Sequence, residues 1–228
     1  MIKSVFLDID DTLLDFHKAE ALAIKETFIA LGIDATDELI EKYSAINLAQ
    51  WKKLERGETT REELLIKRFD ILYGELGLDI SSRKTQGIYE ENLSRHAYFL
   101  DGAAELLKAL YGKYELFIAS NGTAYIQKRR MESLDIAKYF EGIFISEHIG
   151  FDKPSKEYFE ACFAKIPNLE KDKSIIVGDS LTSDILGGIN AGIKTCWFNP
   201  KGKAQSPDIV PDFEIRSLSE LPKLLEKI

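Results

Sequence analysis

Short apolar runs recur along this chain, and each is followed directly by Ser, Asn, Gly or Asp. They are rich in β-branched or aromatic residues, which is typical of buried strands. Several of the stretches between them carry apolar residues at i, i+3, i+4 and i+7, the spacing of a helix with one buried face. Strands that alternate with helices predict a parallel sheet covered on both faces, so the predicted fold class is α/β. The runs are Ser4–Leu7, Glu115–Ala119, Gly142–Ile145, Ser174–Val177 and Lys194–Phe198.

Residues 15–98 interrupt this alternation with a long stretch of helical pattern. Apolar residues recur there at helical spacing with charged residues between them, and Gly57 and Gly74–Gly77 mark breaks. We therefore predict an inserted all-α domain over residues 15–98, and a core domain formed by residues 1–14 and 99–228. An insert of this size is large enough to cover a site.

The composition limits the kinds of molecule that the protein can bind and the cell compartment in which we expect it. A net charge of −8 argues against a nucleic-acid polymer, since binding its backbone needs a dense basic face. A small phosphorylated substrate is compatible, because a bound cation and a few donors reverse the charge locally. Cys162 and Cys196 are too few for a disulfide framework. Acids interrupt the first apolar run, so neither a signal peptide nor a membrane span is expected, and we predict a cytoplasmic protein.

Polar residues gather where the predicted strands end. In doubly wound sheets, ligands bind beyond the carboxyl ends of the strands, so these residues are the candidates for a functional site. A lysine also lies beyond the third run, just before a predicted helix that Pro154 and Ser155 start. The candidates are Asp8, Asp10 and Thr12 in DIDDT, Ser120 and Asn121 in ASNG, Lys153 in DKPS, and Asp179 and Asp184 in GDSLTSD.

These acids together predict a metal site. Several carboxylates at one edge of a sheet repel one another unless a cation lies among them. Oxygen donors without a nearby His or Cys favour a hard ion, and Mg²⁺ suits a phosphoryl site. The histidines, His17, His96 and His148, are scattered without metal-ligand spacing. Each motif alone is an ordinary turn or helix cap, but their order along the chain indicates one joint site.

The four motifs resemble those of the haloacid dehalogenase superfamily, in its phosphatase branch. The resemblance covers almost the whole chain, and the helical block lies where that family has its helical cap. It implies a Rossmann-like core and Mg²⁺-dependent hydrolysis of a phosphomonoester through an aspartyl-phosphate.

The resemblance also implies a role for each motif residue. Asp8 would be the nucleophile and Asp10 the general acid/base. Ser120 and Lys153 would hold the phosphoryl oxygens, together with backbone N–H groups near Asn121.

The remaining implied roles concern the metal and its surroundings. Asp179 would bind Mg²⁺ together with Asp8 and Asp10. Asp184 would orient Lys153 or a water molecule on the metal. We expect Thr12 to brace the loop by hydrogen bonding rather than to touch the substrate.

Two further stretches resemble the pyrimidine 5′-nucleotidase subgroup. One is SDILGGINAGIKTCWFN at 183–199, and the other lies in the predicted cap. If the resemblance holds, the substrates are pyrimidine nucleoside monophosphates, and the candidate contacts are His17, Asn47, Trp51 and Arg68. The alternatives are core packing for Trp51 and a solvated or ion-paired residue for Arg68. The cap likeness rests on Asn47, Trp51, Gly57, Thr60, Leu64, Arg68 and Phe69.

Other functions stay open at this point. A sugar-phosphate or phosphoglycolate phosphatase would use the same core. A phosphomutase would need a dedicated cap acid/base, for which His17 is a weak candidate. A metal-free dehalogenase is disfavoured by Asp10 and the acid cluster, and a catalytically silent phosphate-binding module by the presence of every motif residue. The oligomeric state is left open.

Overall fold

The computed structural model describes residues 1–204 and 206–228, which divide into two compact units. The first unit comprises Met1–Asp15, Phe99–Ala124 and Leu134–Ile228, and the second comprises Phe16–Tyr98 and Tyr125–Ser133. Within the described part of the chain, no helix has the length and apolar character needed to cross a bilayer.

The first unit is built on a parallel sheet, which confirms the predicted α/β class. Over the described residues the sheet has six strands in the order β3-β2-β1-β4-β5-β6. Strands β2 and β4 extend one residue beyond the predicted runs, and β6 was not predicted. The strands are β1 (Ser4–Leu7), β2 (Glu115–Ser120), β3 (Gly142–Ile145), β4 (Ser174–Gly178), β5 (Lys194–Phe198) and β6 (Phe213–Ile215).

Strand β1 lies inside the sheet, at the point where the strand order reverses. Its last residue, Leu7, pairs with Ile118 of β2 and with Val177 of β4. The next residue, Asp8, donates its backbone N–H to the carbonyl of Val177 at 3.0 Å. Asp8 therefore leaves the sheet between two neighbouring strands at a switch point, where sheets of this kind bind ligands.

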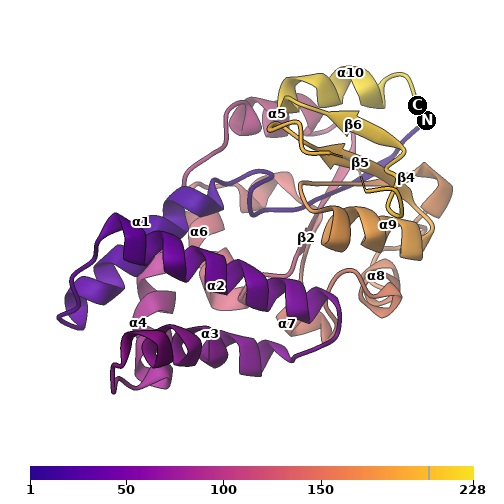
Figure 1. Cartoon of the computed structure of the whole chain (residues 1–228). Helices are drawn as coiled ribbons and strands as arrows, with labels where there is room; N and C mark the ends of the chain where they lie inside the picture. Colours follow the sequence, from indigo (N-terminus) through magenta and orange to yellow (C-terminus); the bar gives the residue numbers. More distant parts are fainter. Residues whose placement is uncertain (205) are drawn as a thin grey trace. The chain divides into compact units, whose positions relative to one another are not determined.

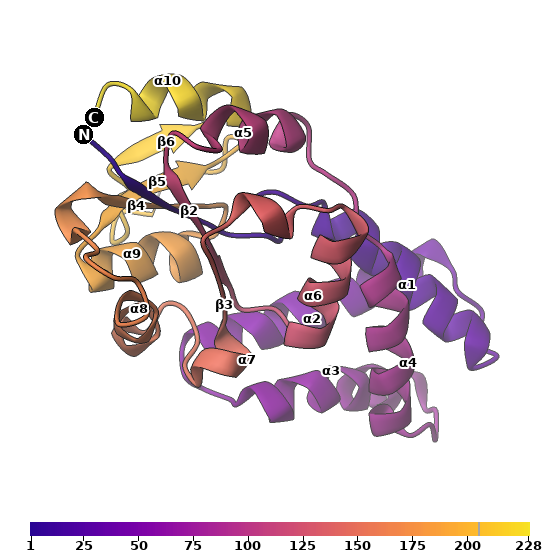
Figure 2. The ribbon, with the colours of Figure 1, turned by 180° about the vertical axis from the view of Figure 1, so that it is seen from behind.

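Helices cover both faces of this sheet (Figures 1 and 2): α5 and α10 lie on one face, α8 and α9 on the other. Ser155 caps α8, and the buried face of that helix packs Phe159 and Cys162 against Phe6 and Ile176. The elements are α5 (Ala103–Leu110), α7 (Ser146–Ile149), α8 (Lys156–Phe163), α9 (Leu186–Ala191), α10 (Leu221–Leu225), the short 3₁₀ helices η1 (Ala137–Tyr139), η2 (Lys171–Lys173) and η4 (Leu218–Glu220), and the π-helical segment η3 (Leu181–Ile185).

The second unit is helical, as the pattern of residues 15–98 predicts. Its core holds a cluster of aromatic rings, in which the ring centre of Tyr43 lies 5.3 Å from that of Phe69 and 5.5 Å from that of Tyr89. Gly77 ends α3 with a positive φ of 66°, whereas Gly74 lies inside that helix rather than at a break. The helices are α1 (Phe16–Ala30), α2 (Asp37–Glu55), α3 (Arg61–Leu76), α4 (Ser82–Arg95) and α6 (Ala124–Ser133).

Helix α6 belongs to the second unit from Tyr125 onward, although it follows a strand of the core in sequence. The Tyr125 hydroxyl donates to Glu91 of α4 at 2.5 Å, and Arg129 donates to the Tyr125 hydroxyl at 2.7 Å. The limits of the predicted insert, 15–98, remain a prediction about how the chain is organised.

Candidate active site

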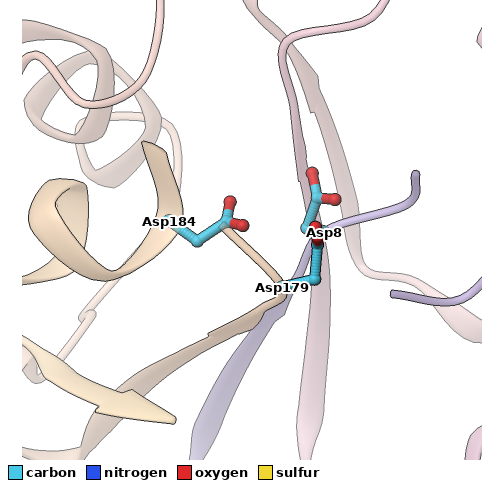
Figure 3. A group of neighbouring side chains, drawn as sticks. All are labelled: Asp8, Asp179 and Asp184. Atoms are coloured by element: carbon cyan, nitrogen blue, oxygen red, sulfur yellow. The ribbon is translucent and has the colours of Figure 1, made fainter. Parts of the chain in front are cut away.

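Three carboxylates meet at the carboxyl edge of the sheet (Figure 3). Asp8 follows β1, Asp179 follows β4, and Asp184 lies in the short π-helical segment η3. One oxygen of each lies within 4.8 Å of the others. Asp8 and Asp184 are buried, whereas Asp179 is half-buried. Like charges at this spacing repel one another, and a nearby cation offsets that repulsion.

Lys153 supplies part of that compensation. Its Nζ donates to Asp8 Oδ1 at 2.7 Å, to Asp184 Oδ1 at 2.6 Å and to the Ala119 carbonyl at 2.6 Å. An ammonium has three donors, so all of them are satisfied although the residue is only 1% exposed. The sequence-predicted lysine therefore lies against the predicted nucleophile.

The electrostatics of this group follow from burial and proximity. Burial raises the pKa of Asp8 well above its usual range; Lys153 opposes this shift, and the charges of Asp184 and Asp10 add to it. Burial alone would lower the pKa of Lys153, but the Asp184 and Asp8 carboxylates outweigh burial and raise it. Lys153 therefore stays charged, and Asp8 ionises more readily with it than it would alone.

Asp184 is held in place by the strand end beside it. Its Oδ2 accepts from the backbone N–H of Ser180 at 3.1 Å, and its Oδ1 accepts from Lys153. A Cβ on Gly178 would occupy the space that the Asp184 carboxyl fills. Glycine at 178 is therefore a steric requirement of the site, one that we had not predicted although this residue opens the GDSLTSD motif.

The predicted phosphate-binding residues lie at the end of the neighbouring strand. Ser120 is buried, and its hydroxyl accepts from the backbone N–H of Gly122 at 3.0 Å. The Asn121 side chain reaches across to Lys153: Oδ1 accepts from the backbone N–H at 2.8 Å, and Nδ2 donates to the carbonyl at 2.8 Å. The direction of the Asn121 side chain was not expected from sequence.

The loop after β1 differs from expectation at Thr12. Its hydroxyl is buried and has no hydrogen-bond partner among the described residues, so it doesn't brace the loop as we expected. Backbone bonds do so instead: the N–H groups of Leu13 and Leu14 donate to the Ile9 carbonyl at 2.9 and 2.8 Å. Asp11 adopts a positive φ of 58° within this turn.

The donor set fits a hard divalent cation. Asp8, Asp179 and Asp184 offer only carboxylate oxygens, the ligands that Mg²⁺ prefers. Asp184 belongs to this group, whereas the Asp10 carboxylate, which we predicted as a ligand, doesn't. Asp10 is half-buried and its charge acts on Asp8. The predicted metal role of Asp10 therefore remains a prediction.

Comparison with known proteins assigns the family. Residues 5–198 match the model of haloacid dehalogenase-like hydrolases. This chain belongs to that family. The predicted resemblance and the prediction of a hydrolase are thereby confirmed.

Individual relatives of this hydrolase match over nearly their full length. The crystal structure of the HAD-hydrolase YfnB from Bacillus subtilis, bound to magnesium, is 38% identical with a TM-score of 0.94 and 98% coverage of each chain. The pyrimidine 5′-nucleotidase PynA of Streptococcus pneumoniae is 34% identical, covering 99% of this chain and 95% of PynA. The pyrimidine 5′-nucleotidase YjjG of Escherichia coli is 32% identical, covering 98% of this chain and 97% of YjjG.

Two of the candidate substrate contacts of this hydrolase lie in a buried polar network of the second unit. Arg68 donates to Asn47 Oδ1 at 2.7 Å and to Gln86 Oε1 at 2.6 Å. Asn47 in turn donates to Glu20 Oε1 at 2.5 Å, and Ser44 donates to Glu20 Oε2 at 2.6 Å. The network links all of α1 to α4. Sequence reasoning missed Glu20, although an acid beside Ala19 and Ala23 on the apolar face of α1 was a visible signal.

The charged groups of this network are buried, so leaving one of them without its partner would be costly. Arg68 is 3% exposed, and its guanidinium lies 4.9 Å from the ring centre of Tyr89. Burial raises the pKa of Glu20, and the bonds from Ser44 and Asn47 and the charge of Arg68 oppose the rise. Arg68 therefore supplies hydrogen bonds to buried groups inside the helical unit.

The other two candidates of the second unit lie nearer to solvent. His17 is exposed near the start of α1. Trp51 is half-buried, with the Arg61 guanidinium 5.5 Å from its ring centre. Substrate contact by His17, Asn47, Trp51 and Arg68 stays a prediction.

We predict that Arg68→Met lowers the free energy of unfolding by about 3 kcal/mol, because it leaves buried polar groups without a partner. Urea unfolding measures the change. Arg83→Met, at an exposed position of α4, is the matched control and should shift stability by less than about 0.5 kcal/mol. Equal effects of the two substitutions would contradict a stabilising role of the network.

Proposed function

We propose that this hydrolase is a Mg²⁺-dependent phosphatase that cleaves a phosphomonoester through a phosphorylated Asp8. The observation that carries the proposal is the buried Asp8 carboxylate at the end of β1, in contact with Lys153 and within 4.8 Å of Asp179 and Asp184. Membership of a hydrolase family supports it.

The reaction divides into two displacements. An Asp8 oxygen bonds to phosphorus as the ester P–O bond breaks, and Asp10 gives its proton to the leaving alkoxide. A water molecule then attacks the same phosphorus while Asp10 takes its proton. This step releases inorganic phosphate and restores the Asp8 carboxylate. Asp10 thus acts as an acid first and as a base afterwards.

The surrounding residues would stabilise the negative charge of the phosphoryl group in both displacements. Lys153 and Ser120 would donate to the phosphoryl oxygens, with backbone N–H groups after β2. Asp8, Asp179 and Asp184 are the residues that would hold Mg²⁺. When bound, the ion offsets the repulsion between these carboxylates and the anionic substrate.

The proposed substrate is a pyrimidine nucleoside monophosphate such as UMP or dTMP. Support comes from two relatives named pyrimidine 5′-nucleotidases, which match this chain at 34% and 32% identity across both units. The proposed partner is therefore a small phosphorylated metabolite. A cytoplasmic location stays a prediction.

A phosphate-release screen with Mg²⁺ present tests the substrate. We expect UMP and dTMP to be hydrolysed with a higher kcat/KM than purine nucleotides, phosphoglycolate or sugar phosphates. A preference for sugar phosphates or phosphoglycolate would favour the alternative phosphatase. Conversion of a sugar phosphate into its isomer without phosphate release would favour the phosphomutase.

Asp8→Asn tests the nucleophile. We expect kcat to fall by at least about 10⁴-fold, since the amide cannot form the acyl phosphate. Asp11→Asn is the matched control: the same change lies three residues along, at a left-handed backbone position that Asn tolerates, and should keep wild-type activity. Full activity in Asp8→Asn would remove Asp8 from the mechanism.

Removal of the metal tests the cation. We expect dialysis against EDTA to abolish turnover and Mg²⁺ to restore it. Mg²⁺ should also raise the melting temperature of the wild type, and this rise should shrink in Asp179→Asn. Unchanged turnover after EDTA treatment would show that the reaction needs no divalent ion.

A further inference from the structure

We infer that Asn121 is a positioning residue, which fixes the main chain of Lys153 so that the ammonium of Lys153 reaches Asp8. The inference rests on the proposed function for its catalytic consequence, but its structural content concerns residues of the first unit alone.

The first observation is a pair of hydrogen bonds between one side chain and one residue's backbone. Asn121 Oδ1 accepts from the Lys153 N–H, and Asn121 Nδ2 donates to the Lys153 carbonyl, both at 2.8 Å. The donor and acceptor of Lys153 define which Asn121 atom is oxygen and which is nitrogen. The amide thus joins the end of β2 to the segment before α8, 32 residues further along.

The second observation is that the ammonium of Lys153 bonds acceptors on three different segments of the first unit. Its Nζ donates to Asp8 at 2.7 Å, to Asp184 at 2.6 Å and to the Ala119 carbonyl at 2.6 Å. All three bonds can form only while the main chain of Lys153 lies at the right distance from each acceptor, and the Asn121 amide fixes that main chain. Asp184 is anchored separately by the Ser180 N–H, so it does not follow a displaced Lys153, and a shift of the Lys153 main chain weakens the set of three bonds that includes Asp8.

The role of the Asn121 side chain therefore differs from the roles of Ser120 and Lys153, which are proposed to contact the phosphoryl group. The carbonyl oxygen and one N–H of the Asn121 amide are committed to Lys153, so its contribution to the site runs through that residue. Small displacements of a positioned group cost up to about 10²-fold in rate, and supporting contacts of this kind determine the precision of a site.

Asn190→Ala provides a matched control. Asn190 Nδ2 donates to the carbonyl of Pro154 at 2.9 Å, so this substitution removes a side-chain bond to the adjacent residue and leaves Lys153 clamped. Asn121→Ala should reduce kcat/KM about 30-fold, mainly through kcat, whereas Asn190→Ala should match the wild type.

A double-mutant cycle tests whether Asn121 acts through Lys153. Asn121→Ala should cost little further activity in a Lys153→Ala background. Equal activity of Asn121→Ala and wild type, or fully multiplicative losses in the double variant, would overturn the inference.

A readout independent of turnover is the ¹H–¹⁵N signal of the Lys153 ammonium, assigned by its absence in Lys153→Arg. Three acceptors and burial should make this signal slow to exchange and visible in wild type and in Asn190→Ala. It should broaden or vanish in Asn121→Ala while the melting temperature shows a folded protein. An unchanged signal would overturn the inference.

Failure of the proposed phosphatase function can be told apart from failure of the inference about Asn121. A wild type that hydrolyses no phosphomonoester would refute the proposed function, and the ammonium signal would still decide the role of Asn121. If Asn121→Ala does not fold, Asn121→Asp replaces it, because it keeps the acceptor for the Lys153 N–H but loses the donor to the carbonyl. The same loss of signal is expected, and its persistence would count against the inference.

Discussion

One buried ammonium among carboxylates is the interaction on which the rest of this site depends. Lys153 Nζ contacts Asp8 and Asp184, and without a cation these two charges would be costly to bury side by side. The parallel sheet makes the arrangement possible, because β1 ends between β2 and β4. The carboxyl ends of these strands thereby bring together residues that lie more than a hundred positions apart in sequence.

Several features of the site are energetically unfavourable when each is considered alone. Burial raises the pKa of Asp8, Asp11 adopts a left-handed conformation, and the hydroxyl of Thr12 is buried with no bond to any residue that the structure describes. Such features persist where the surrounding structure determines them, and they cluster at functional sites. Here backbone bonds around Ile9 and the anchoring of Asp184 by Ser180 provide that surrounding support.

Sequence reasoning succeeded where local pattern determines structure. Apolar runs predicted five of the strands, and the rule that ligands gather at strand ends singled out Asp8, Asp179 and Asp184. It missed β6, whose three residues, Phe-Glu-Ile, form no apolar run. It also missed the pairing of Asn121 with Lys153 and the link between Asn47 and Glu20. These are contacts between side chains distant in sequence, and neither periodicity nor composition encodes them.

The central claim is that Asp8 carries the phosphoryl group between two displacements. Its most direct test is mass spectrometry of enzyme quenched in acid during turnover of UMP with Mg²⁺, followed by digestion and mapping. The account predicts one phosphoryl group, located on the peptide that contains Asp8 and absent from Asp8→Asn. Steady release of phosphate from an enzyme that carries no phosphoryl group at any quench time, or carries it on another residue, would contradict the account.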